Sequence, residues 1–132
     1  MASTTQQQTP PRALTRTQKW GRIDVFPTAV AAIAGHAAVG CYGVMGMAAR
    51  GLRDGVGQLL HRESAHRGVE VRDLGGSLAI EVYVIVQYGT RITEVAHNLQ
   101  QAVRFEVERT VGVPVAEVNV NVQGVHEDSA RE

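Results

Sequence analysis

Apolar and polar residues alternate over residues 23–25, 69–72, 78–88 and 118–123. This period of two predicts β-strands, and the even positions of 78–88 form one continuous apolar face. The glycine-rich residues 42–47 predict another short strand, whose small side chains let neighbouring backbone approach closely. The pair Gly75-Gly76 predicts a tight turn between the strands at 69–72 and 78–88.

Three other stretches carry apolar residues at helical spacing. The first helix is predicted after Pro27, which suits a first helical turn, and Gly40 can end it. A second, short helix is predicted over residues 52–60. A third, long helix runs from residue 92 to about 110 and is stopped by Gly112 and Pro114. Its apolar side consists of Ile92, Val95, Ala96, Leu99, Val103, Val107 and Thr110.

The predicted order is β-α-β-α-β-β-α-β in a chain of 132 residues, an ordinary size for one domain. We therefore expect a single α+β domain, with a mixed β-sheet and helices packed on one face. Residues 1–18 are polar and contain Pro10-Pro11, which predicts a disordered N-terminal arm. The domain itself is expected over residues 19–125. Residues 126–132 are expected to form a flexible tail.

The sheet face opposite the predicted helices has a mixed character. Alternation along residues 78–88 and 118–123 places apolar, aromatic, charged and amide side chains there together. One interpretation is an ordinary open sheet face, since protein surfaces are largely apolar anyway. The other is a surface for self-association or for a protein partner. Under that hypothesis the candidate interaction residues are Glu81, Tyr83, Ile85, Gln87, Asn119 and Asn121.

Composition narrows the classes of function. Basic and acidic residues balance at 13 each, which argues against nucleic-acid binding, because phosphate contacts normally require a basic excess. Residues 29–49 lack formal charge but are rich in Ala and Gly. We expect them to form a buried helix and a strand rather than a membrane span. The polar start of the chain has no signal-like apolar core, so a cytoplasmic location is expected.

The sequence contains no complete set of phosphate-binding, metal-binding or catalytic residues. The glycines at 40, 43, 46, 51, 55 and 57 lack the Lys-Ser/Thr ending of a phosphate-binding loop. The five histidines lack metal-ligand spacing, so neither a metal nor a cofactor is expected. Cys41, the one cysteine, excludes an internal disulfide and a cysteine metal cluster. An enzyme that uses Cys41 with His36 or His97 remains an alternative, although a small packing cysteine is the more common case.

Three segments together resemble a known family. Residues 21–27 (GRIDVFP) are similar to an opening G-x-I-x-I-x-P pattern. Residues 81–92 (EVYVIVQYGTRI) and 95–100 (VAHNLQ) resemble a hydrophobic strand, Tyr-Gly, a basic residue, Ile, and then V-A-x-N-[IL]-Q. Residues 118–125 (VNVNVQGV) resemble V-N-V-x-V-x-G-V. These patterns are those of the bacterial alkaline shock protein family, also called envelope stress response proteins.

The resemblance covers residues 20 to 125 and departs at Thr93, where many relatives have proline. It implies a non-enzymatic, cytoplasmic α+β protein that acts as a scaffold in the cell envelope stress response. The implied partners are other copies of the chain and a membrane-anchored protein. The alternative is a regulatory module that binds an enzyme of lipid or fatty-acid metabolism, or a small acyl ligand.

Overall fold

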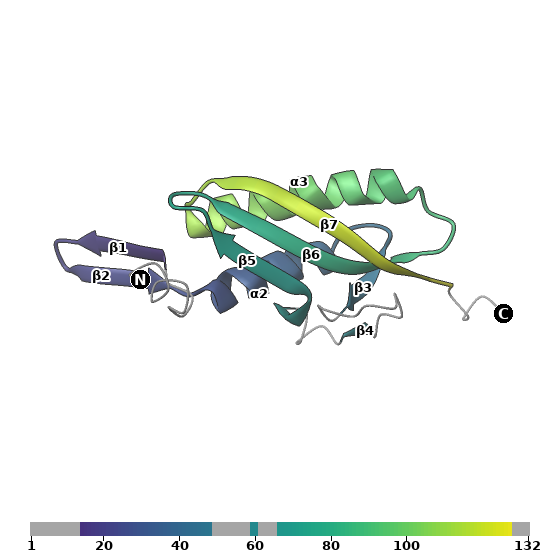
Figure 1. The fold of residues 1–132 in the computed structure, drawn as a ribbon, viewed down its shortest axis with the longest axis horizontal. Coiled ribbons are helices and arrows are strands. Elements are labelled where there is room, and N and C mark those ends of the chain that lie inside the picture. The colour runs from purple at the N-terminus through teal and green to yellow at the C-terminus, as the bar shows by residue number, and fades with distance from the viewer. Residues whose placement is uncertain (1–13, 49–58, 61–65, 128–132) are drawn as a thin grey trace, which may run out of the picture.

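The centre of the sheet is the long strand β6, Leu78–Gln87. The structure is a computed structural model that describes residues 14–48, 59–60 and 66–127. β7, Val115–His126, runs parallel to β6 along its whole length. β5 (Val69–Asp73) and β3 (Val44–Ala48) run antiparallel to successive halves of β6, and β4 (Leu59–Leu60) pairs with β3. Because β7 occupies one side of β6, β5 and β3 follow one another along the other side (Figure 1).

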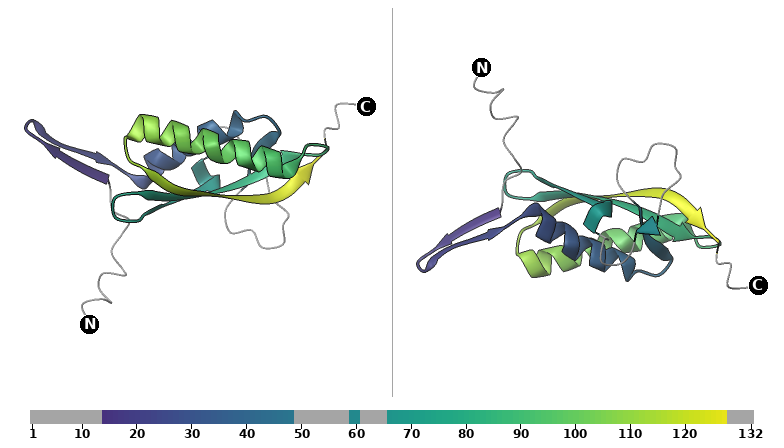
Figure 2. Two further views of the ribbon diagram at one scale, coloured as in Figure 1. Left: turned by 90° about the horizontal axis from the view of Figure 1, so that it is seen from above. Right: turned by 90° about the horizontal axis from the view of Figure 1, so that it is seen from below.

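Two helices cover one face of this sheet. α2 spans Pro27–Val39 and α3 spans Ile92–Val111, and both lie on the same side of the strands (Figure 2). The even positions of β6, from Leu78 to Val86, are buried beneath them. Val95, Leu99, Val103 and Val107 of α3 meet this apolar face. The core is therefore built almost entirely from aliphatic side chains, as the scarcity of aromatic residues predicts.

The ends of the helices follow local chemistry. Pro27 occupies the first turn of α2, where its missing N–H costs nothing, and Gly40 caps the other end. α3 ends at Gly112, whose φ of 83° is left-handed. Its N–H donates to the carbonyl of Glu108. Val95, near the start of α3, packs so closely on Gly43 that a Cβ there would lie 2.6 Å from a methyl carbon of Val95.

The predicted fold class is confirmed: the chain is a single α+β domain whose strands and helices follow the predicted order. One local difference lies in the second predicted helix. Leu59 and Leu60, expected at its end, form strand β4 because they pair with Ala48 and Met47. Residues 52 and 56 of the same prediction lie outside the described residues.

A β-hairpin projects from the start of α2, away from the body of the domain (Figure 1, Figure 2). It consists of β1, Leu14–Gln18, and β2, Gly21–Val25, paired antiparallel from Leu14↔Val25 to Gln18↔Gly21. Residues 14–18 thus differ from the disordered arm expected up to residue 18, because β2 supplies them with a pairing partner. Residues 1–13 lie outside the described part of the chain, as do residues 128–132 of the expected tail. β7 includes His126, where that tail was expected to begin.

Candidate interaction surfaces

A polar network crosses the sheet face that α2 and α3 leave uncovered. At its centre is Glu81 of β6, whose two carboxylate oxygens accept hydrogen bonds from the side-chain amides of Asn119 and Asn121 on β7. The Asn121 amide lies 3.0 Å from Glu81 Oε1. Arg72 lies on the other neighbouring strand, β5. Its Nη2 atom is 3.6 Å from Glu81 Oε2 and 3.5 Å from Glu117 Oε2. The network therefore joins three strands across β6 and leaves the Glu81 carboxylate well satisfied.

The surroundings of Glu81 act on its acidity in opposite directions. Desolvation by partial burial acts to raise the pKa of this carboxyl group, whereas the amides of Asn121 and Asn119 and the charge of Arg72 lower it. The lowering effects prevail, and the pKa of Glu81 lies below its ordinary value of 4.5. Glu81 is consequently ionised at neutral pH and favours the folded state in that form.

The other predicted interaction residues fall into two groups. Tyr83 and Gln87 are half-buried on the same open face as Glu81, as are Asn119 and Asn121. Ile85 is only 6% exposed, so it contributes little to any surface on this face. The sequence did not reveal Arg72 and Glu117 as members of the network, because their place depends on the register of β5 and β7 against β6.

The lowered pKa of Glu81 predicts a dependence of stability on pH. Because its pKa is lower in the folded state, the stabilisation is complete above the unfolded pKa and is lost as the pH falls through the folded pKa. Glu81→Gln keeps the size of the side chain but removes the charge. We expect the difference in unfolding free energy between wild type and variant to be constant near neutral pH. It should shrink below about pH 4.5.

Urea denaturation of both proteins at a series of pH values measures this difference, and comparing the two cancels the contributions of other carboxyl groups. A difference that stays the same down to pH 2.5 would show that Glu81 has no lowered pKa.

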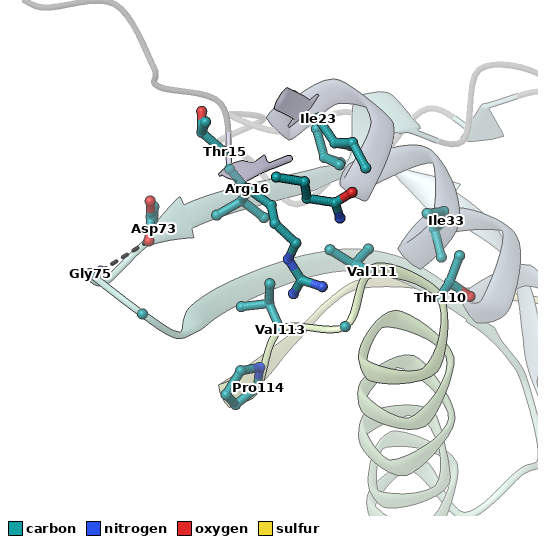
Figure 3. A pocket seen from close by; sticks show the side chains of 15 residues that line it. Thr15, Arg16, Ile23, Ile33, Asp73, Gly75, Thr110, Val111, Val113 and Pro114 are labelled. Carbon is teal, nitrogen blue, oxygen red and sulfur yellow. Dashed lines mark hydrogen bonds between the residues drawn. The ribbon is translucent and has the colours of Figure 1, made fainter. Parts of the chain in front are cut away.

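The second candidate surface is the hairpin together with an open groove beside it, which we call the end groove. The hairpin forms one wall, and the opposite wall comes from Ile33 in the middle of α2, the β5–β6 turn, the end of α3 and the segment between α3 and β7 (Figure 3). The groove has a volume of about 810 Å³. Its apolar lining consists of Leu14, Ile23, Val25, Ile33, Val111, Val113 and Pro114. Arg16 and Asp73 supply its charges.

The hairpin also exposes large apolar side chains to solvent. Trp20, at its tip, is 88% exposed, with Lys19 Nζ 5.8 Å from the ring centre. Ile23 is 52% exposed, and Phe26, which follows the hairpin directly, is 56% exposed. Sequence reasoning missed this surface. The apolar residues at 20, 23 and 26 were the available signal, but their exposure depends on the hairpin leaving the body.

Cys41, His36 and His97, which were considered for catalysis, are not hydrogen-bonded to one another. The Cys41 thiol faces the carbonyl oxygen of Ala37 at 3.5 Å, and burial raises the pKa of this thiol. The less nucleophilic thiol form therefore predominates at neutral pH. His36 lies exposed on α2, and His97 lies exposed on α3 beside Gln101. Among residues 14–48, 59–60 and 66–127, no group of three His, Cys, Asp or Glu side chains could hold a metal ion.

The glycines that were considered for a phosphate-binding loop serve packing or helix capping in the described part of the chain. Gly40 caps α2, Gly43 lies against Val95, and Gly46 is buried opposite Ile85. The glycines at 51, 55 and 57 lie outside the described residues. Of the helices that the structure describes, none combines the length and apolarity needed to cross a bilayer.

The fold and these surfaces define a small α+β domain with a polar open sheet face and a projecting apolar hairpin. Residues 15–127 match the model of the alkaline shock protein 23 family, which is described as having a cell envelope-related function. The chain belongs to this family, as the resemblance of its motifs predicts. The family description names no catalytic activity.

The relatives extend over most of the chain. The uncharacterized protein YloU of Bacillus subtilis (strain 168) is 47% identical over 108 residues, covering 81% of this chain and 90% of YloU. The uncharacterized protein Spy1614 of Streptococcus pyogenes serotype M6 is 33% identical over 108 residues, covering 81% of this chain and 89% of that protein. Among solved structures, the nickel form of a MamM CTD variant has a TM-score of 0.44 at 18% identity. That similarity covers 76% of this chain and 98% of the MamM chain.

Proposed function

We propose that this protein is a non-enzymatic interaction protein of the bacterial cell envelope stress response. It acts in the cytoplasm, through self-association or through docking on a membrane-anchored partner. The observation that carries the proposal is the projecting hairpin, on which Trp20 and Ile23 are largely exposed, as is Phe26 directly after it. Membership of a family with a cell envelope-related function supports the cellular setting.

The physical argument concerns what the hairpin needs in order to be stable. An isolated two-stranded hairpin is marginally stable in water, because it can bury little apolar surface by itself. Large exposed apolar groups gathered on one element are typical of protein interaction sites, and tryptophan is especially common among residues that dominate binding energy. A protein contact on the hairpin would bury these side chains and fix the two strands.

The open sheet face supplies a second, more polar contact surface in this proposal. Glu81 holds Asn119 and Asn121 in fixed positions through hydrogen bonds, so a partner would meet a preorganised surface rather than flexible side chains. Tyr83 and Gln87 would border it. The hairpin would then provide the apolar part of the interaction and the sheet face its polar part.

Light scattering on the purified chain, combined with fractionation of native cells, tests this function. The proposal predicts a solution mass above the 14.2 kDa of one chain, or a membrane-bound fraction that protease treatment of the membranes releases. A protein that stays monomeric at high concentration and never sediments with membranes would contradict it.

A second candidate is the binding of a small acyl ligand, or regulation of an enzyme of lipid metabolism, and the end groove favours the former. Its lining is mainly apolar, and Arg16 could pair with a carboxylate head group. Native mass spectrometry of the purified chain with an added fatty acid tests this candidate. A stoichiometric adduct that Arg16→Gln weakens would support it, and an adduct-free spectrum at saturating ligand would remove it.

A further inference from the structure

The hairpin has two chemically different faces. In an antiparallel pair, residues directly opposite one another project from the same side. The register therefore places Leu14, Val25 and Ile23 on one face, together with Arg16 and Gln18. Thr17 and Arg22 project from the other face, as do Thr15 and Asp24. The hairpin is thus an amphipathic ribbon. Every side chain of its apolar face lines the end groove, and Thr15 of the other face also borders it.

The end groove indicates the shape of what would fill it. One wall is the apolar face of the hairpin, and the opposite wall presents Ile33, Val111 and Val113 (Figure 3). The five-residue strands of the hairpin make this wall roughly 17 Å long at about 3.4 Å per residue. Two β-layers pack face to face at about 10 Å. A short, thin element with an apolar face fits this space.

The charges of the hairpin and of the groove indicate that the occupant carries positive charge. The hairpin carries Arg16, Lys19 and Arg22 against one carboxylate, Asp24, so three positive charges and one negative leave a net charge of +2. Asp73 lines the groove on the far wall. Because Arg16 lines the hairpin wall, the attraction is confined to the far wall, where a basic tip would approach Asp73. Such a pairing favours one orientation of the occupant.

We propose that the end groove is filled by the hairpin of a second copy of this chain, exchanged reciprocally across a two-fold axis. The hairpin is itself a short apolar ribbon with a basic tip, so it has the properties that the groove requires of its occupant. Two-fold exchange satisfies both copies at once, as in isologous dimers. The two apolar faces pack on each other, and each tip, with Lys19 and Trp20, reaches the far wall of the partner's groove, along which Asp73 and Thr110 lie. This inference rests on the proposed function, because it names the surface through which the chain self-associates.

Disulfide cross-linking between two singly labelled proteins tests the exchange. In a Cys41→Ser background, Lys19→Cys labels the hairpin tip and Thr110→Cys labels the groove wall. Thr110 is exposed and lines the groove, so its replacement is mild. Mixed and oxidised, the two proteins should form a one-to-one cross-linked pair in high yield. Because each protein carries one thiol, this product can arise only between copies.

A matched control places the second thiol at the opposite end of the body. Tyr88, in the turn after β6, is 66% exposed, and Tyr88→Cys should give at least tenfold less cross-linking to the hairpin tip. Light scattering on the protein without introduced cysteines separates hairpin exchange from self-association in general. A dimer with equal yields from Thr110→Cys and Tyr88→Cys overturns the exchange but leaves self-association intact. A strictly monomeric protein overturns both exchange and self-association.

Discussion

Replacement of Leu99 by alanine is expected to lower the free energy of unfolding by about 2–5 kcal/mol. Leu99 is fully buried at the middle of α3, where it meets the apolar side of β6. Its truncation removes apolar area from the core and leaves a cavity, because the aliphatic neighbours can relax only in part. Urea denaturation followed by circular dichroism gives the free energy of unfolding.

Phe105→Ala on the same helix is the matched control. Phe105 is larger than Leu99 but 65% exposed, with Arg109 6.0 Å from its ring centre. Its truncation should change the unfolding free energy by less than about 1 kcal/mol, as most surface substitutions do. Equal effects at the two positions would mean that α3 does not bury the face assigned to it.

Ile23→Asp is expected to weaken self-association by about tenfold to a hundredfold. Full burial of an isoleucine side chain is worth roughly 1.5–3 kcal/mol. About half of that remains to be gained at each Ile23, and a two-fold dimer contains two copies, so the total loss is again roughly 1.5–3 kcal/mol. A carboxylate in the same place must also be desolvated. Ile23 lies on the apolar face of the hairpin and is 52% exposed in the single chain, so its contribution depends on a partner. Sedimentation velocity over a range of concentrations measures the dissociation constant.

Thr17→Asp introduces the same charge on the opposite face of the hairpin, across from Arg22. Because Arg22 can neutralise the new carboxylate, the hairpin itself should remain stable. This variant should associate as the wild type does. If Thr17→Asp disrupts association as strongly as Ile23→Asp, the apolar face is not the contact surface.

The parts of the fold that could be predicted are those in which a periodic pattern coincides with a clear end signal. β6 follows from an unbroken alternation, because one face is fully buried beneath the helices. α3 follows from its apolar stripe and from Gly112, which takes the left-handed conformation that ends the helix. Such signals are local, so they survive without knowledge of the tertiary structure.

The hairpin could not be predicted in the same way. Its first strand, Leu14–Gln18, has one large apolar residue among polar ones, so composition alone indicates disorder. What orders it is pairing with β2, a property of two segments together. The end groove is still less accessible to sequence reasoning, because its walls come from segments as distant as Arg16, Asp73 and Val113.

The polar network on the open sheet face could be predicted only in part. Alternation along β6 and β7 predicts that Glu81, Asn119 and Asn121 share the open face, and the structure shows both asparagines donating hydrogen bonds to Glu81. Arg72 completes the network only because β5 pairs with β6 in a register that sets it beside Ala79. Strand register depends on turns and core packing, which a single alternating stretch does not specify.

The central claim is that a second copy of the chain covers the apolar face of the hairpin. Hydrogen–deuterium exchange tests this most directly. Backbone amides of residues 14–25 should exchange quickly in dilute protein and become protected as the concentration rises, whereas amides of β6 remain protected throughout. Ile23→Asp should move the gain in protection to concentrations about tenfold to a hundredfold higher. If protection of residues 14–25 were the same at the lowest and highest concentrations, the claim would be contradicted.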